Sequence, residues 1–123
     1  MTKLLDTSVL VDCLRRRDHA LAFIDSLGGK PSVSVATVQE LYAGAESAAA
    51  ESNIEVYIRS SFVLPATIPI ARSAGQHMRH YASSHGLDDL DAIIAATAEH
   101  HDLKLATLNV KHFPMFARLK RAY

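Results

Sequence analysis

Short apolar runs that are typical of buried strands alternate along this chain with longer segments of helical periodicity. The strand-like runs occupy residues 2–5, 32–35, 62–66 and 104–108, and helical patterns fill most of the sequence between them. Parallel strands need long crossover connections, which are usually helices, so this alternation predicts a parallel sheet covered on both faces. We therefore expect an α/β fold, a three-layer α/β/α sandwich with a central parallel sheet.

The helices are predicted from apolar periodicity and from residues that start or stop a helix. A long helix is expected to begin at Thr37 and to run through the Ala-rich section that follows. The segment 67–86 has Pro69 in its first turn and Gly86 at its end, as helix boundaries favour. Further helices are expected at 8–17, 18–29, 53–62 and 88–101, and an irregular tail at 113–123.

Length and composition predict one cytoplasmic domain that spans residues 1–123. Of these 123 residues 49% are hydrophobic, which is enough for one compact core. No apolar stretch approaches the roughly 20 residues of a membrane span, and no apolar signal segment follows Met1. The single cysteine, Cys13, cannot form an internal disulfide and is expected to be a core residue.

Four carboxylates stand where an α/β fold gathers ligands. Asp6 ends the first strand, Glu40 lies just past the second, and Asp88 and Asp91 open the helix 88–101. Strand ends and helix starts meet at the carboxyl edge of a parallel sheet. Carboxylate oxygens are the ligands that Mg²⁺ and Mn²⁺ prefer, so the pattern predicts a divalent metal site and a phosphate-bearing substrate.

Each of these acids also has a structural interpretation. Thr37 and Glu40 fit a capping box, in which Glu40 would bond only the backbone at a helix start. Asp88 could cap its helix, and Asp91 could favour the positive end of the helix dipole. Asp6 could cap the first helix, although Thr7 or Ser8 could do the same. The place of Asp6 at the end of an apolar strand favours a role as a metal ligand.

Positive charge is distributed unevenly although Lys plus Arg equal Asp plus Glu at 13 each. Arg15, Arg16 and Arg17 form one basic run, and the C-terminal segment from Lys111 is basic. Basic edges around an acidic, metal-binding centre would suit a polyanion. Ordinary solvated surfaces can give the same pattern, so charge by itself does not identify a nucleic-acid partner.

Four segments in order carry a family resemblance: LLDTSVLVD, ELYAGA, DAIIAATA and LATLNVKHF. Together they resemble the PIN-domain ribonucleases, and among these the short single-domain toxins of the VapC type. The resemblance implies an acidic pocket that holds one or two divalent ions and cleaves RNA by attack of water, leaving a 5′-phosphate. It also implies a transfer or ribosomal RNA substrate, a homodimer and a small VapB-like antitoxin.

Carried onto this sequence, the catalytic and metal-binding acids of the family fall on Asp6, Glu40 and Asp91, with Mg²⁺ as cofactor and Mn²⁺ as a substitute. Where many relatives have a fourth Asp, this chain has Asn109 and His112. The Asn109 carbonyl oxygen could ligate a metal or its water, but it brings no charge. We therefore expect a second ion to bind weakly or only together with RNA phosphate.

Other polar residues are candidates for supporting roles. Ser8 and Thr107 could hydrogen-bond the metal ligands, or could be ordinary turn hydroxyls. Arg15, Arg16 and Lys111 are candidates for contacts with RNA phosphates. His77 and His80 have the helical spacing of a zinc pair, but no Cys partner or HExxH pattern accompanies them, so a zinc site is not expected.

Two other functional classes remain open. In a phosphatase with Asp6 as nucleophile, a second Asp would stand two residues later, where this chain has Ser8. In a non-catalytic module, a degraded metal site would bind RNA or a partner without cleaving it, and Asn109 keeps that alternative open. Metal-dependent release of RNA fragments separates these classes from a ribonuclease.

Overall fold

The computed structural model describes residues 3–123, and the predicted strand residue at position 2 lies outside this range. In chain order the elements are β1 (Lys3–Leu5), α1 (Thr7–Leu14), α2 (Asp18–Ser26), β2 (Ser32–Ser34), α3 (Val35–Ala43), α4 (Ala48–Arg59), β3 (Phe62–Leu64), α5 (Ile68–His85), α6 (Asp89–His100), β4 (Lys104–Ala106) and the 3₁₀ helix η1 (Val110–His112). The predicted alternation of strands and helices is confirmed.

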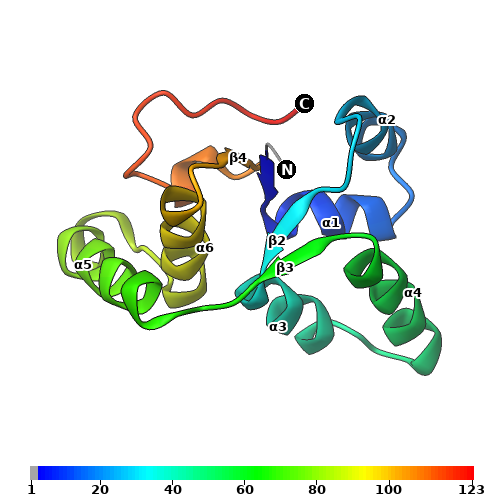
Figure 1. Cartoon of the computed structure of the whole chain (residues 1–123), viewed down its shortest axis with the longest axis horizontal. Coiled ribbons are helices and arrows are strands. Elements are labelled where there is room, and N and C mark those ends of the chain that lie inside the picture. Colours follow the sequence, from blue (N-terminus) through cyan, green and yellow to red (C-terminus); the bar gives the residue numbers. More distant parts are fainter. Residues whose placement is uncertain (1–2) are drawn as a thin grey trace.

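A four-stranded parallel sheet forms the centre of the molecule, with the strand order β3-β2-β1-β4 (Figure 1). In this register Leu4 lies opposite Ser32 on one side and Leu105 on the other. Because β1 is an inner strand, the chain leaving it at Asp6 lies between the ends of β2 and β4. The polar residues after these strands are thereby brought to one edge.

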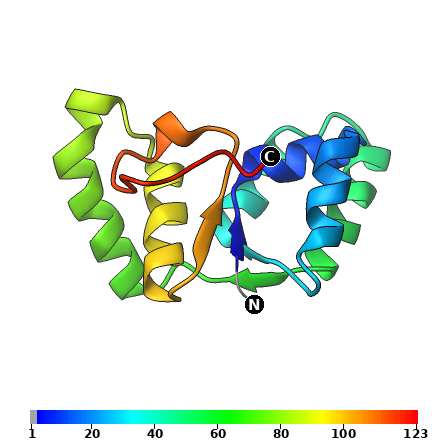
Figure 2. The same cartoon turned by 90° about the horizontal axis from the view of Figure 1, so that it is seen from above.

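Helices cover both faces of the sheet, which confirms the three-layer α/β/α sandwich (Figure 2). Leu4 and Leu5 are both fully buried, and as neighbours in a strand they point to opposite faces. Leu5 packs in a core with residues of α1, α2, α3 and α4, whereas Leu4 packs against α6. The helix α5 covers the outer side of α6, where Ile70 is buried.

The long helix expected from Thr37 is wrong, because two serine caps divide this region into α3 and α4. Ser34 caps α3 by accepting a hydrogen bond from the Ala36 N–H at 3.0 Å, so the helix begins at Val35. Ser47 caps α4 and accepts from the Ala50 N–H at 3.0 Å. Side-chain oxygens at these positions satisfy amide groups that would otherwise lack partners.

Other boundaries differ less. The first helix ends at Leu14 and does not include the basic run, because Arg16 has a left-handed backbone with φ of 58°. The helix expected over 67–86 is found as α5, and Gly86 ends it with φ of 64°. Cys13 is fully buried, as expected. Burial, with a contribution from Asp12, raises the pKa of its thiol to about 11.

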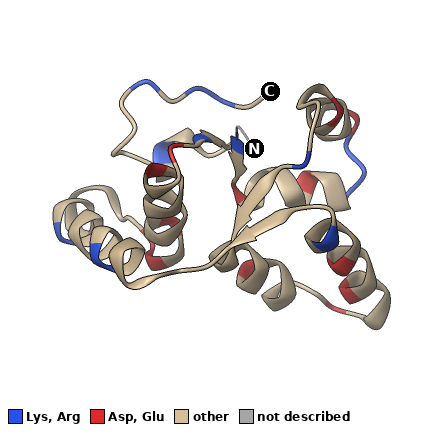
Figure 3. Ribbon diagram, viewed as in Figure 1, with Lys and Arg blue, Asp and Glu red and all other residues tan. Residues whose placement is uncertain are grey.

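The C-terminal tail, residues 113–123, has no regular helix or strand, as expected, and crosses the molecule beside β4 (Figure 1). Several of its residues are basic (Figure 3). Phe113 at its start is buried against α6 and Leu105. Within residues 3–123, no helix has the length and apolar character that would let it cross a membrane.

Candidate metal centre

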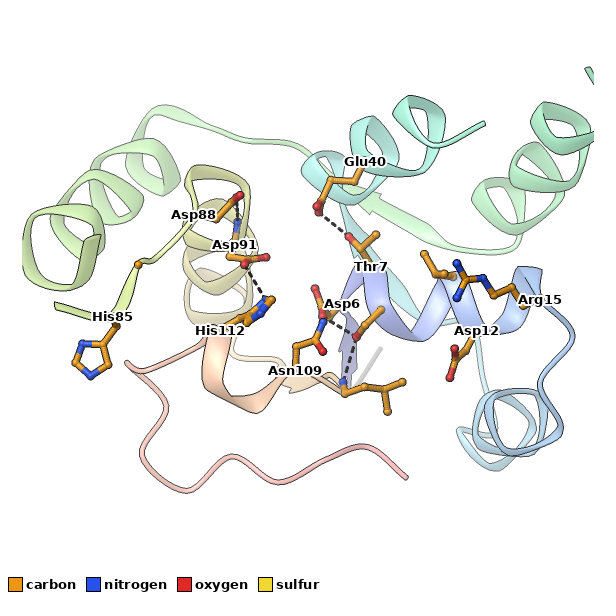
Figure 4. A pocket seen from close by; sticks show the side chains of 14 residues that line it. Asp6, Thr7, Asp12, Arg15, Glu40, His85, Asp88, Asp91, Asn109 and His112 are labelled. Carbon is orange, nitrogen blue, oxygen red and sulfur yellow. Dashed lines mark hydrogen bonds and ion pairs between the residues drawn. The ribbon is translucent and has the colours of Figure 1, made fainter. Parts of the chain in front are cut away.

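Carboxylates from several elements line one pocket at the carboxyl edge of the sheet (Figure 4). The pocket has a volume of about 540 Å³. Its acidic lining residues are Asp6, Asp12, Glu40, Asp88 and Asp91. The structure therefore brings together the three acids predicted as metal ligands, which are separated by 34 and 51 positions in the sequence (40 − 6 and 91 − 40).

Asp6 is the buried anchor of the pocket, with 3% of its surface exposed. It occupies the N-cap position of α1, but its side chain makes no capping hydrogen bond, so the capping interpretation is wrong. Instead, its Oδ2 accepts hydrogen bonds from Ser8 Oγ at 2.8 Å and Thr107 Oγ1 at 2.7 Å. These two hydroxyls hold the carboxylate in one orientation.

The same hydroxyls are fixed by the backbone that follows β4. Ser8 Oγ accepts from the Leu108 N–H at 3.1 Å, and Thr107 Oγ1 accepts from the Asn109 N–H at 2.9 Å. Each hydroxyl thus uses a lone pair on a backbone amide and its own proton on Asp6. This network ties the end of β1 to the end of β4, and it places Ser8 and Thr107 where they would orient a metal ligand.

Glu40 does not form the predicted capping box, because α3 begins at Val35 and is capped by Ser34. Its Oε1 accepts a hydrogen bond from Thr7 Oγ1 at 2.7 Å, and Thr7 Oγ1 also lies 3.0 Å from Thr37 Oγ1. Burial raises the pKa of the Glu40 carboxyl, while the Thr7 hydrogen bond opposes that rise. A pocket position, and not a helix cap, therefore explains Glu40.

Asp88 and Asp91 open α6 but differ in role. Asp88 is the predicted helix cap, since its Oδ1 accepts from the Leu90 N–H at 2.7 Å. The Asp91 side chain is 14% exposed and faces the pocket (Figure 4). Burial raises its pKa to about 7, helped by the charges of Asp6, Asp88 and Glu40. Without a bound cation, the Asp91 carboxylate therefore binds a proton close to neutral pH.

Asn109 and His112 stand at the two places where many relatives in the resembling family have a fourth Asp. Both line the pocket, and Asn109 lies beside Asp6 (Figure 4). The His112 side chain is 58% exposed, and its Nδ1 is 3.4 Å from Asp91 Oδ2. When protonated, His112 would partly offset the charge of Asp91. The sequence motif pointed to both positions, but only the structure shows the contact with Asp91.

The predicted basic contacts do not all reach the pocket. Arg15 lines it, whereas Arg16 and Lys111 do not, although both side chains are exposed. Asp12 was not predicted. It stands on α1 four residues after Ser8 and three before Arg15, and this helical spacing is the signal that could have identified it.

The donor chemistry of the pocket fits a hydrated divalent cation. No group of three His, Cys, Asp or Glu side chains within residues 3–123 is arranged to hold an ion directly. Mg²⁺, however, commonly keeps several waters and binds one or two carboxylates. Asp6 and Asp91 supply such oxygens, and a cation would offset the burial and the neighbouring negative charges that raise the pKa of Asp91. Elsewhere, on the outer side of α6, His77 Nε2 lies 2.6 Å from Glu99 Oε1.

Comparison with known proteins gives matches that span nearly the whole chain. The model of the PIN domain family matches residues 3–120. Ribonuclease VapC10 of Mycobacterium tuberculosis is 45% identical over 122 residues, which cover 95% of this chain and 90% of that protein. Ribonuclease VapC19 of the same organism is 38% identical over 125 residues, covering 98% of this chain and 99% of that one.

Solved structures show the same fold. A chain of a toxin–antitoxin complex from Klebsiella pneumoniae superposes with a TM-score of 0.84 at 25% identity, covering 99% of this chain and 98% of that chain. A chain of the FitAcB structure from Neisseria gonorrhoeae has a TM-score of 0.66 at 31% identity, covering 91% of both chains. The family match spans nearly the whole sequence, and the chain belongs to the PIN domain family, among relatives of the VapC type.

Proposed function

We propose that this protein is a metal-dependent endoribonuclease that hydrolyses RNA with Mg²⁺, for which Mn²⁺ can substitute, and that it is the toxin of a type II toxin–antitoxin module. The observation that carries the proposal is the convergence of Asp6, Glu40 and Asp91 on one pocket. Two relatives that match nearly the whole chain are named ribonucleases, which supports RNA as substrate.

The pocket as it stands would repel RNA, because both its lining and a phosphodiester are negative. A divalent cation bound at this site would supply Lewis acidity, which would lower the pKa of a water molecule and stabilise charge on the departing 3′-oxygen. Asp6 and Asp91 would hold it, with Glu40 either as a direct ligand or through water. Asn109 could add a neutral oxygen on the side of Asp6.

The residues of the chain contribute position and proton affinity. Asp6 cannot rotate freely, because Ser8 and Thr107 both donate to its Oδ2. Thr7 fixes Oε1 of Glu40, which leaves Oε2 available to accept a proton from an attacking water. Burial raises the pKa of Glu40 and makes it a better base than an exposed glutamate. The proposed reaction leaves a 5′-phosphate.

Cleavage of purified RNA is the direct test. Wild-type protein should release fragments in Mg²⁺ or Mn²⁺, should stop in EDTA, and should resume when Mg²⁺ is restored. Sequencing the 5′ ends, with and without removal of 5′-phosphates, identifies both the bond and the product chemistry. Hydrolysis of phosphate monoesters without RNA cleavage would instead indicate the phosphatase class. Whether transfer or ribosomal RNA is cut stays a prediction until those ends are read.

A second candidate is a module that binds RNA or a partner without cleaving it. It is favoured by Asn109, which removes one formal charge from the predicted ligand set, and by the absence, within residues 3–123, of three acids arranged around one point. This candidate predicts RNA binding that persists in EDTA with no metal-dependent fragments. The cleavage experiment above therefore separates the two candidates.

We also propose a VapB-like antitoxin as partner. Structures related to this fold include VapBC assemblies, two of them bound to DNA. An Arg or Lys inserted near Asp6 and Asp91 by a segment that is disordered alone would pair with the clustered carboxylates. Expression without antitoxin should halt growth, and Asp6→Asn should relieve the arrest. Normal growth of cells that contain abundant soluble wild-type protein and no antitoxin would contradict the proposal that the protein is a toxin.

The homodimer implied by the resemblance is also a proposal. Apolar side chains remain exposed on the edge strand β3 and at the start of α5: Phe62 at 43%, Val63 at 39% and Ile68 at 77%. Such exposure on an edge strand suits contact with a second chain. Ile68→Glu should shift the sedimentation of a dimer toward the monomer, and an unchanged dimer would exclude this surface.

A further inference from the structure

A second cavity lies between the C-terminal tail and the β1–β4 pair, with a volume of about 750 Å³. It is lined by β4 and the residue before it, by the start of β1, and by tail residues 115–122. All of its charged lining residues are basic: Lys3, Lys104, Arg118, Lys120 and Arg121. We call this cavity the basic groove.

The cations of the basic groove are not neutralised by nearby acids. Four of them have exposed side chains, and the fifth, Lys3, is half-buried with its ammonium 5.9 Å from the centre of the Phe23 ring. None of the five belongs to an ion pair in the part of the chain that the structure describes. In a chain of zero net charge, this separation leaves a local positive field (Figure 3).

The tail that forms one wall of the groove is anchored at its end. The Ala122 N–H donates to the Thr107 carbonyl at 2.9 Å, and the Tyr123 hydroxyl donates to Asp12 Oδ2 at 2.9 Å. The Tyr123 ring also lies 5.6 Å from that of Phe23, centre to centre. These contacts hold the wall in place, so the groove is present before any ligand binds.

The basic groove and the acidic pocket are neighbours along β4. The groove follows β4 up to Ala106, the next residue is Thr107 of the Asp6 network, and Leu108 and Asn109 line the pocket. Thr107 itself is buried and its carbonyl accepts from the Ala122 N–H, so a polymer that extends from the groove to the pocket would pass over the end of the tail. The five carboxylates of the pocket repel a polyanion. Most of the cations that attract it must therefore lie on another surface.

We propose that the basic groove binds the phosphate backbone of the RNA whose scissile bond lies in the acidic pocket. This inference rests on the proposed function. Lys3 and Lys104 lie on the sheet side of the groove, and the other three cations lie on the tail side. Cations along both walls suit RNA, which carries one negative charge per nucleotide. The apolar groove residues Met115, Phe116 and Leu119 offer contact to base faces. An acidic peptide is the competing occupant.

The test compares two variants that each lose three exposed cations. The groove variant carries Arg118→Gln, Lys120→Gln and Arg121→Gln. The control carries Lys30→Gln, Arg72→Gln and Arg79→Gln, which are exposed, lie outside the groove and form no ion pair within residues 3–123. Unchanged circular dichroism and melting temperature establish that both variants fold.

Binding is measured by fluorescence anisotropy with a labelled single-stranded RNA of about 20 nucleotides, over a range of KCl concentrations. EDTA is present, so no RNA is cut. The groove variant should bind about tenfold more weakly at low salt, and its slope of log K against log salt should be smaller by about 2. The control should stay within about twofold of wild type. Equal losses in both variants, or none in the groove variant, would overturn the proposal.

Two further measurements assign the occupant and separate this inference from the proposed function. In the first, poly-glutamate replaces RNA in the binding assay. If the groove variant loses binding of poly-glutamate but binds RNA as wild type does, the groove binds an acidic peptide and the RNA proposal is overturned. In Mg²⁺, the groove variant should keep wild-type cleavage of a tetranucleotide and lose cleavage of long RNA. If wild type binds RNA through the groove but cuts neither substrate, the groove inference holds and the nuclease proposal fails.

Discussion

The acidic pocket and the basic groove meet at β4 but are built in opposite ways. In the pocket, hydroxyl groups donate to Asp6 and Glu40, and the side chains of Asp6 and Asp91 are largely removed from water. The groove cations, except Lys3, are exposed, and most of them lie on an irregular tail. Burial makes negative charge costly unless a cation compensates it, whereas exposed cations stay hydrated and attract a polyanion at longer range.

For the proposed ribonuclease, this difference would assign the chemistry to the pocket and the attraction of RNA to the groove. Hydrolysis of a phosphodiester needs metal ligands held to within a fraction of an ångström, and the two hydroxyls that donate to Asp6 would hold that carboxylate in such a position. Attraction of RNA needs net charge more than exact position, and an irregular segment can supply that. Changes in the pocket should therefore affect the rate of cleavage, and changes in the groove should affect binding of long RNA.

The largest expected effect is the loss of a pocket carboxylate. Asp6→Asn or Asp91→Asn should lower cleavage by roughly a thousandfold or more, because each removes a charged cation ligand while keeping the shape of the side chain. RNA binding in EDTA should not weaken, since a repulsive charge is lost. Asp25→Asn, on the exposed side of α2, is the control. If both pocket variants cleave at the wild-type rate, the site is misassigned.

The next effect tests the hydroxyl network. Thr107→Val removes a donor to Asp6 and the acceptor of the Asn109 N–H. Cleavage should fall by about 10- to 100-fold, and stability by about 1–3 kcal/mol. Thr107→Ser should restore both. Thr97→Val is a matched control, because the buried Thr97 hydroxyl donates to the Ile93 carbonyl within α6 and, among the described residues 3–123, makes no hydrogen bond to the Asp6 network. Equal cleavage in the two valine variants would show that Asp6 needs no such support.

A third prediction concerns pH and the stability of the metal-free protein. The pKa of Asp91 is about 7 when folded, against 3.8 for the free side chain, so the folded state binds the extra proton between these values. Its contribution to stability is complete below pH 3.8 and is lost as the pH rises through 7. In EDTA at pH 8, Asp91→Asn should be more stable than wild type by on the order of 2 kcal/mol.

Thermal unfolding at several pH values checks this prediction. The gain should shrink as the pH falls toward 4, and Mg²⁺ should stabilise wild type more than the variant. Cleavage at limiting Mg²⁺ should rise with pH up to about 7, as Asp91 loses its proton. A gain in stability that does not depend on pH would mean that the charge of Asp91 is not its cause.

The smallest effect is expected at the departure from the family pattern. Asn109→Asp should tighten Mn²⁺ binding by about tenfold, because it adds a fourth charge to the predicted ligands Asp6, Glu40 and Asp91. Isothermal titration calorimetry measures this change. Asn53→Asp adds the same charge on the exposed surface of α4 and should leave the affinity unchanged. If the two variants bind Mn²⁺ alike, Asn109 lies outside the reach of the ion.

Much of the fold could be predicted from local sequence, because strands and helices have different apolar periods. The α/β/α sandwich, the boundaries of α5 and the cap at Asp88 followed from such signals. The break between α3 and α4 did not, because Ala-rich residues favour a helix on either side of it. Ser34 and Ser47 set where α3 and α4 begin, because each side chain accepts a hydrogen bond from a backbone amide of the first turn. A serine can do this only where the backbone leaves that amide unpaired, which local sequence does not show.

For the site, the sequence by itself determined which carboxylates are available, since Asp6, Glu40 and Asp91 stand next to strand ends or helix starts. It could not choose between capping and pocket roles, because both use acids at the same local positions. Tertiary structure decided this by bringing Thr7 to Glu40 and Thr107 to Asp6. Such hydrogen bonds join residues 33 and 101 positions apart, and only the packed parallel sheet sets their distance.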